Sequence, residues 1–128
     1  MTYYSAKILD VPFDDAVDKV VAQLEIEGFG VLTTIDIQEA LKKKLGVDFS
    51  RYVILGACNP PLAYEALQLE NKIGTMLPCN VIVRDLGDDR TEVAAVDPVS
   101  SMQAIDNPKL KTVATTVQAK LANVIKSL

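Results

Sequence analysis

Residues 52–61, YVILGACNPP, are the stretch that decides the fold. The uninterrupted apolar run at 52–55 predicts a β-strand that is covered on both faces. Asn59 is a favourable helix N-cap, and Pro60 suits the first position of a helix. The stretch therefore predicts a strand that leads, through a short glycine-containing segment, directly into a helix.

Two more strand–helix pairs precede this stretch. Residues 3–9 and 31–35 are predicted strands, and apolar residues recur at helical spacing between Phe13 and Leu24. Asp36 and Glu39 have the spacing of a capping box, so a second helix is expected to begin there. We expect its apolar residues to form a buried stripe: Ile37, Ala40, Leu41 and Leu45.

A hairpin and a long helix follow. Strands at 79–84 and 91–96 flank a turn at Gly87-Asp88-Asp89, and Asn107-Pro108 begins the last helix. The element order is β-α-β-α-β-α-β-β-α. It predicts a single α+β domain over residues 1–128, a two-layer sandwich with helices packed on a mixed β-sheet. We expect the hairpin to lie at or near an edge of that sheet.

Composition excludes several function classes. The net charge of −4 and the seven Phe and Tyr residues disfavour a nucleic-acid-binding protein, and Lys42-Lys43-Lys44 fits a solvated helix face. The chain has no His, so Ser-His-Asp and Cys-His catalysis and the usual zinc sites are not expected. We expect neither a metal nor a cofactor. No signal peptide or membrane-spanning stretch is recognisable, and two cysteines suit a reducing compartment, so a cytoplasmic protein is expected.

Cys58-Asn59-Pro60 is the segment most suggestive of chemistry. A residue just before a helix faces N–H groups that favour an anion, either a bound phosphate or carboxylate or the thiolate of Cys58. Gly56 would let a ligand approach the backbone closely. The structural alternative is a small buried cysteine ahead of an ordinary cap. The sequence leaves both interpretations open.

Cys79-Asn80 repeats the same dipeptide at the start of a later strand. A right-handed crossover would place Cys79 at the far end of the sheet from Cys58. If residues 74–78 instead run back as extended chain, they span roughly 17 Å and bring the two cysteines together. The sequence does not distinguish these alternatives.

Three segments resemble the domain of unknown function 302 family. They are GACNPPLAYEAL at 56–67, MLPCNVIV at 76–83, and GFGVLT at 28–33 with Asp36-Ile37. The resemblance implies a compact α+β sandwich that is often dimeric, with no settled reaction, substrate or cofactor. It maps the family's motif onto these residues: Cys58, Asn59, Pro60, Pro78, Cys79 and Asn80.

Three functions are compatible with these observations, and whether the protein is an enzyme stays open. The leading hypothesis is a homodimeric domain that binds a small molecule or anion near these residues: Gly56, Cys58, Asn59, Pro60, Cys79 and Asn80. The second is a thiol-dependent redox or sulfur-handling enzyme, in which Cys58 is the nucleophile and Cys79 the resolving thiol. The third is a structural or assembly protein with inert cysteines.

Overall fold

Residues 2–128 are described by a computed structural model, in which one five-stranded sheet has the order β1-β5-β4-β3-β2. The strands are β1 (Tyr4–Leu9), β2 (Gly30–Asp36), β3 (Tyr52–Cys58), β4 (Cys79–Gly87) and β5 (Arg90–Val96). All four neighbouring pairs are antiparallel, so the sheet is not mixed as predicted. The strands β2 and β3, and likewise β3 and β4, are antiparallel neighbours, and a helix lies in the loop that connects each pair. These connections are not crossovers between parallel strands.

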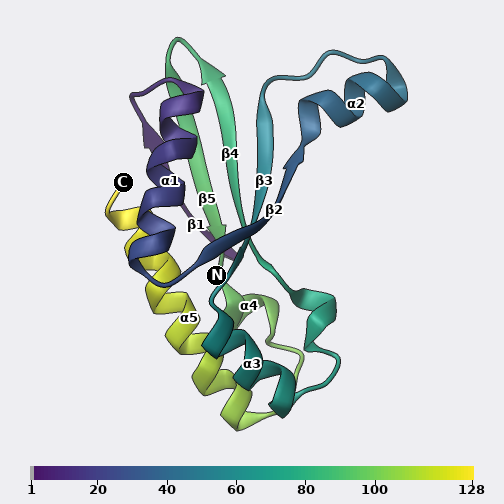
Figure 1. The fold of residues 1–128 in the computed structure, drawn as a ribbon, viewed down its shortest axis with the longest axis vertical. Coiled ribbons are helices and arrows are strands. Elements are labelled where there is room, and N and C mark those ends of the chain that lie inside the picture. Colours follow the sequence, from purple (N-terminus) through teal and green to yellow (C-terminus); the bar gives the residue numbers. More distant parts are fainter. Residues whose placement is uncertain (1) are drawn as a thin grey trace.

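Helices α1 (Phe13–Ile26) and α5 (Pro108–Lys126) cover one face of this sheet (Figure 1). Helix α3 (Pro60–Leu69) follows β3 and packs against α5 beyond the end of that strand. The core packs fully buried residues of α1 and α5, such as Val20 and Leu121, against Val81 and Val93 of the sheet. The α+β two-layer architecture is confirmed. The short helices η1 (Ile73–Met76) and α4 (Pro98–Ser101) are additions that the sequence did not predict.

The hairpin of β4 and β5 forms as predicted, with Asp88 and Asp89 both at positive φ in its turn. Neither of its strands forms an edge of the sheet, although β5 lies next to the edge strand β1, so the expectation of a place at or near an edge holds only for β5. The N-terminal strand β1 pairs along β5, and β3 pairs along β4, so the hairpin lies in the interior of the sheet. Its flanking neighbours come from distant parts of the chain, which local patterns do not identify.

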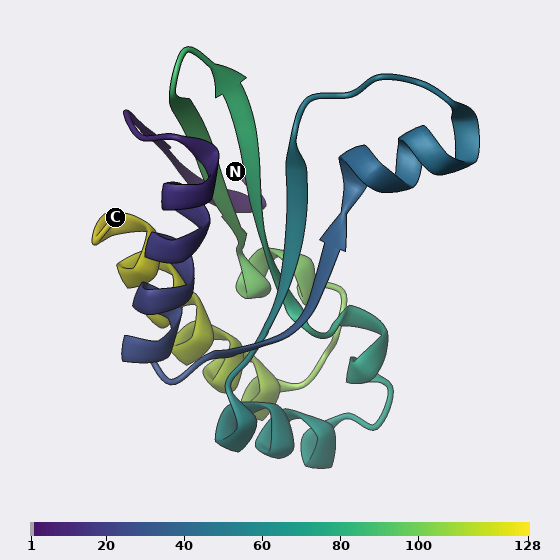
Figure 2. The ribbon, with the colours of Figure 1, turned by 45° about the horizontal axis from the view of Figure 1, so that its top comes forward.

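Helix α2 (Ile37–Leu45) contradicts the prediction of a buried stripe. None of its residues is buried, and Leu45 is 69% exposed. The helix stands apart from α1, α3 and α5 in both views (Figures 1 and 2). It lies in the connection between β2 and β3, away from the helices that cover the sheet, and its contacts with β3 leave Ile37, Ala40 and Leu41 only half-buried.

Strand β3 is likewise covered on one face only, and not on both as predicted. Val53, Leu55 and Ala57 are buried beneath the helices, whereas Tyr52 and Ile54 on the other face are only half-buried. Among the described residues, no helix is both long and apolar enough to cross a membrane.

Candidate functional site

A cavity of about 340 Å³ lies between α3, α5 and the adjoining ends of β3 and β4. Helices α3 and α5 supply its two long walls, and the segment around Pro78 and the short helix α4 complete it. The helical residues of the long walls are Leu62, Ala63, Ala66, Leu67, Leu110, Val113, Ala114 and Val117. Nearly all the lining atoms are apolar.

Small side chains create this hollow. Ala57, Ala63, Ala66 and Ala114 face the cavity from three different elements. Protein interiors are normally packed as densely as organic crystals, so a space of this size is a distinct feature of the fold. Ala57, Ala66 and Ala114 are buried, whereas the lining residue Leu67 is 44% exposed. The cavity is therefore accessible from the surface.

The two cysteines meet at this cavity. Cys79 pairs with Ala57 across β3 and β4, so it lies next to Cys58 in the neighbouring strand. Both residues line the cavity, and both thiols are free. The antiparallel pairing of β3 with β4 thus resolves the alternative that the sequence left open: Cys79 lies near Cys58.

The two thiols have different surroundings. Cys58 is half-buried where β3 ends, whereas Cys79 is buried. Burial, with a smaller contribution from charge on the nearby Cys58, raises the pKa of the Cys79 thiol from 9.0 to about 11. Cys79 is therefore a neutral thiol at physiological pH.

Asn59 has a defined structural role beside the cavity. Its Oδ1 accepts a hydrogen bond from the Leu62 N–H at 3.4 Å, which caps α3 as predicted. Its Nδ2 donates to the Glu27 carbonyl at 3.3 Å, just after α1. Because both ends of the amide are engaged, Asn59 ties the start of α3 to the end of α1.

The N-terminus of α3 lacks the free donors that an anion would need. Pro60 and Pro61 occupy its first two positions and carry no N–H. The Leu62 N–H bonds the Asn59 side chain, and the Ala63 N–H bonds the Asn59 carbonyl at 2.9 Å. The second proline, visible in the sequence, is the signal that the expectation of an anion-binding terminus overlooked.

The remaining predicted site residues lie elsewhere. A Cβ on Gly56 would be 2.3 Å from Thr33 Oγ1 and 2.7 Å from Pro78 Cγ, so protein atoms occupy the space assigned to a ligand. Asn80 pairs with Gly56 and is exposed on the sheet face away from the helices. Pro60 is exposed and does not line the cavity. Of the six predicted residues, the cavity brings together Cys58, Asn59 and Cys79.

Sequence reasoning missed the contribution of α5 to the site. The helical spacing of Leu110, Val113 and Val117 predicts a core face, and these residues are buried, but they also line the cavity. The periodicity of apolar residues indicates which face of a helix is buried, but it does not show whether other side chains fill the space in front of that face. Ala114, also buried, is the one signal of reduced volume on that face. Residues 2–128 contain no cluster of three or more His, Cys, Asp or Glu side chains arranged to hold a metal ion.

Comparison with protein families gives a match over residues 4–128 to the domain of unknown function DUF302. The chain belongs to the DUF302 family. A crystal structure of an uncharacterized conserved DUF302 protein from Bacillus stearothermophilus has the same fold, with a TM-score of 0.90. That protein is 27% identical to this DUF302 chain, and the match covers 98% of each chain. No curated protein matches the sequence.

Proposed function

We propose that this DUF302 protein binds a small, predominantly apolar molecule in the cavity between α3 and α5. The supporting observation is the cavity itself, about 340 Å³ of accessible space with an almost wholly apolar lining. Ligand sites in proteins are typically concave and lined by apolar side chains, with few polar groups. A hollow of this kind binds apolar molecules because they replace contacts that the lining side chains lack.

The polar groups around the cavity favour an apolar ligand over an anion. The first two positions of α3 are prolines without an N–H group, and the N–H groups at the next two positions are hydrogen-bonded within the chain. Both ends of the Asn59 side-chain amide are also hydrogen-bonded. The neutral thiol of Cys79 supplies no charge at physiological pH. An anion that entered the cavity would lose its hydration without gaining donors, which costs several kcal/mol.

The volume limits the size of the ligand. The cavity, at about 340 Å³, is roughly twice the ~150 Å³ of a known engineered cavity that holds benzene. It would therefore accommodate a fused two-ring aromatic or a short aliphatic chain. Cys58 and Cys79 are among the lining residues, and a polarisable sulfur makes favourable contacts with aromatic rings. We therefore favour an aromatic ligand. Two free thiols also suit a reducing compartment such as the cytoplasm.

Naphthalene and indole are suitable probes for a thermal-shift and calorimetric test. A molecule that binds only the folded protein raises the unfolding temperature by mass action. Ala114→Leu fills the cavity from α5 and should abolish the shift, whereas Ala119→Leu, on an exposed position of the same helix, should retain it. The proposal fails if neither probe shifts the parent protein, or if both variants respond equally.

Thiol-dependent chemistry is the second candidate, because Cys58 and Cys79 are neighbours on paired strands and share one cavity. Hydrogen peroxide would oxidise the two thiols to one disulfide and be reduced to two molecules of water. The raised pKa of Cys79 disfavours this reaction, since the thiolate is the attacking form. Intact-mass and peptide analysis after peroxide treatment tests it. A Cys58–Cys79 disulfide would support it, and oxidation of Cys58 alone to a sulfinic acid would reject it.

A further inference from the structure

A second hollow, of about 350 Å³, lies on the sheet face that points away from α1 and α5. It shares no lining residue with the cavity between α3 and α5. Three of the four tyrosines in the chain line it: Tyr3, Tyr4 and Tyr52. The chain has only seven Phe and Tyr residues and no Trp, so this concentration of aromatic side chains distinguishes the hollow from the rest of the surface.

Strand pairing places the tyrosines on opposite sides of the hollow. Tyr52 of β3 pairs with Arg84 of β4 at one side. The next outward-facing row along these strands contains Ile82 of β4 paired with Ala94 of β5. Tyr4 lies one row further on, at the start of β1. Because alanine is small, Ala94 leaves space between the tyrosines, and it forms part of the floor of the hollow with Ile82.

Tyr3 and Tyr4 form a corner. Their ring centroids are 5.0 Å apart, and the ring planes are nearly perpendicular, at 74°. The Asp97 N–H donates to the Tyr3 carbonyl at 2.8 Å, which ties this end of the chain to the residue that follows β5. The corner therefore presents two aromatic walls at an angle to each other.

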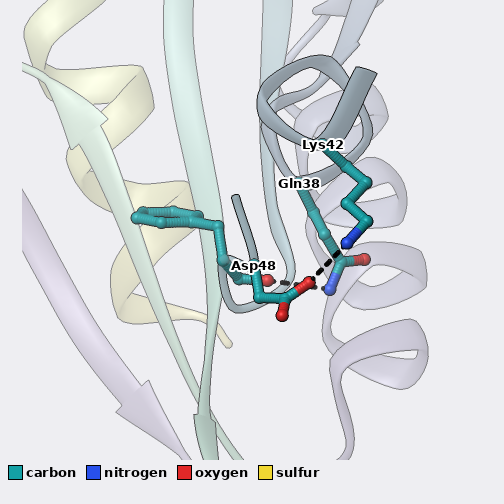
Figure 3. Close-up of polar contacts among 4 residues, drawn as sticks. Gln38, Lys42 and Asp48 are labelled. Carbon is teal, nitrogen blue, oxygen red and sulfur yellow. Dashed lines mark hydrogen bonds and ion pairs between the residues drawn. The ribbon is translucent and has the colours of Figure 1, made fainter. Parts of the chain in front are cut away.

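Tyr52 is positioned by the loop that follows α2. Its ring lies 6.2 Å from the Phe49 ring, measured between centroids. The Phe49 carbonyl accepts a hydrogen bond from Gln38 Nε2 at 2.9 Å, and Lys42 pairs with Asp48 at 2.9 Å (Figure 3). These contacts fix the loop against α2, so the aromatic wall at this side is in place before a ligand binds. Such preorganisation lowers the entropic cost of binding.

The charge of the lining favours a cation over an anion. Glu92 is the one charged residue that lines the hollow. Arg84, which is not a lining residue, donates to Glu92 Oε1 at 2.6 Å and fixes the orientation of the carboxylate. The Arg84 guanidinium also offsets part of the carboxylate charge. Most of the attraction for a cation must therefore come from the tyrosine rings.

We propose that this hollow binds a quaternary ammonium group. The faces of aromatic rings attract cations electrostatically, and sites for quaternary ammonium groups combine several aromatic walls. The methyl groups of such a cation would pack on Ile82 and Ala94 and need no hydrogen-bond acceptors. A primary ammonium group would lose its hydration there and leave its N–H donors without acceptors. This site is separate from the proposed cavity for an apolar molecule, and neither depends on the other.

A titration of the ¹⁵N-labelled protein with choline, followed by NMR, tests the proposal. We expect saturable shifts of the Ile82 and Ala94 amides. The uncharged carbon isostere of choline, 3,3-dimethyl-1-butanol, has the same shape and should bind at least tenfold more weakly, because it lacks the charge that the rings attract. Trimethyllysine in a short peptide presents the same group from a protein, so the tighter of the two probes identifies the source of the natural ligand.

Tyrosine variants identify the site. Tyr4→Ala and Tyr52→Ala should each weaken choline binding about tenfold, whereas Tyr52→Phe keeps the ring and should retain most of the affinity. Tyr64→Ala is the matched control, because this fourth tyrosine is 66% exposed on α3 and does not line the hollow. Ala94→Leu should fill the floor and abolish binding.

Three outcomes would overturn the proposal: no saturable binding of choline or trimethyllysine, equal binding of choline and its uncharged isostere, or an equal loss in Tyr64→Ala and the other two tyrosine variants. Circular dichroism of each variant should match that of the parent, since the altered residues point away from the core. The response to naphthalene should also be unchanged, because the hollow and the cavity have no lining residue in common. The two binding sites can therefore fail separately.

Discussion

The ring of Pro78 lies directly over Gly56, so close that a Cβ on Gly56 would be only 2.7 Å from Pro78 Cγ. This contact joins β3 to the residue that immediately precedes β4. It therefore helps to fix where Cys79 enters the sheet beside Cys58. Glycine at position 56 serves the packing of these two strands, which explains its place in a strand that otherwise favours larger residues.

Gly56→Ala should destabilise the protein by about 1–3 kcal/mol, the usual cost of forcing extra atoms into a packed site. The added methyl group would meet both the Pro78 ring and Thr33 Oγ1. Gly30→Ala in β2 is the matched control, because a Cβ there meets nothing within 4 Å. Urea unfolding of both variants measures the difference. Equal stability of the two variants would contradict the close packing over Gly56.

Asn59→Ala should lower the free energy of unfolding by about 1–2 kcal/mol, since it removes the α3 cap. It also removes the hydrogen bond to the Glu27 carbonyl. Asn59→Asp separates the two effects, because a carboxylate still accepts from the Leu62 N–H but cannot donate to Glu27. We expect the stability of Asn59→Asp to lie between those of Asn59→Ala and the parent. If Asn59→Asp were as unstable as Asn59→Ala, the link to Glu27 would be the only contribution of the side chain.

Ala114→Leu should stabilise the unliganded protein by about 0.5–2 kcal/mol, because filling an existing cavity buries apolar surface without displacing neighbours. Ala114 lies on the wall that α5 contributes to the cavity. The exposed control Ala119→Leu should stay within about 0.5 kcal/mol of the parent. Thermal and urea unfolding provide the comparison. A loss of stability in Ala114→Leu would mean that the space beside α5 is already filled in solution.

The sequence was sufficient where structure depends on nearby residues. Asn59 and Asn107 were recognised as caps, and each accepts hydrogen bonds from the first turn of its helix. The hairpin turn at Asp88 and Asp89 was equally clear. Such signals depend on contacts within a few residues, so they do not change with the way the rest of the chain folds.

Features that depend on distant contacts were not predictable. The stripe of α2 correctly indicated a helix, but periodicity cannot show that no element faces Leu45. Strand order, and with it the approach of Cys79 to Cys58, follows from how β3 and β4 pair. The cavity depends on how little volume Ala66 and Ala114 fill between helices that are far apart in sequence. A pattern of apolar residues in the sequence does not show how much space between two helices is left unfilled.

The raised pKa of Cys79 makes stability depend on pH in a defined direction. The folded-state pKa of about 11 exceeds the 9.0 of an unperturbed thiol, so the folded protein keeps a proton that the unfolded chain loses. The contribution to the free energy of unfolding is fully present below pH 9.0 and is lost as the pH rises through about 11. A difference of about two pKa units corresponds to roughly 2–3 kcal/mol.

Other groups also titrate in this range, so the measurement is the difference between the parent and Cys79→Ala in urea unfolding across the same pH interval. The parent should lose more stability than Cys79→Ala as the pH rises. Cys58→Ser should reduce this excess loss in part, because charge on Cys58 is the second cause of the shift after burial. Parallel pH profiles for the parent and Cys79→Ala would show that Cys79 is not buried as a neutral thiol. The main structural argument against a resolving role for Cys79 would then be lost.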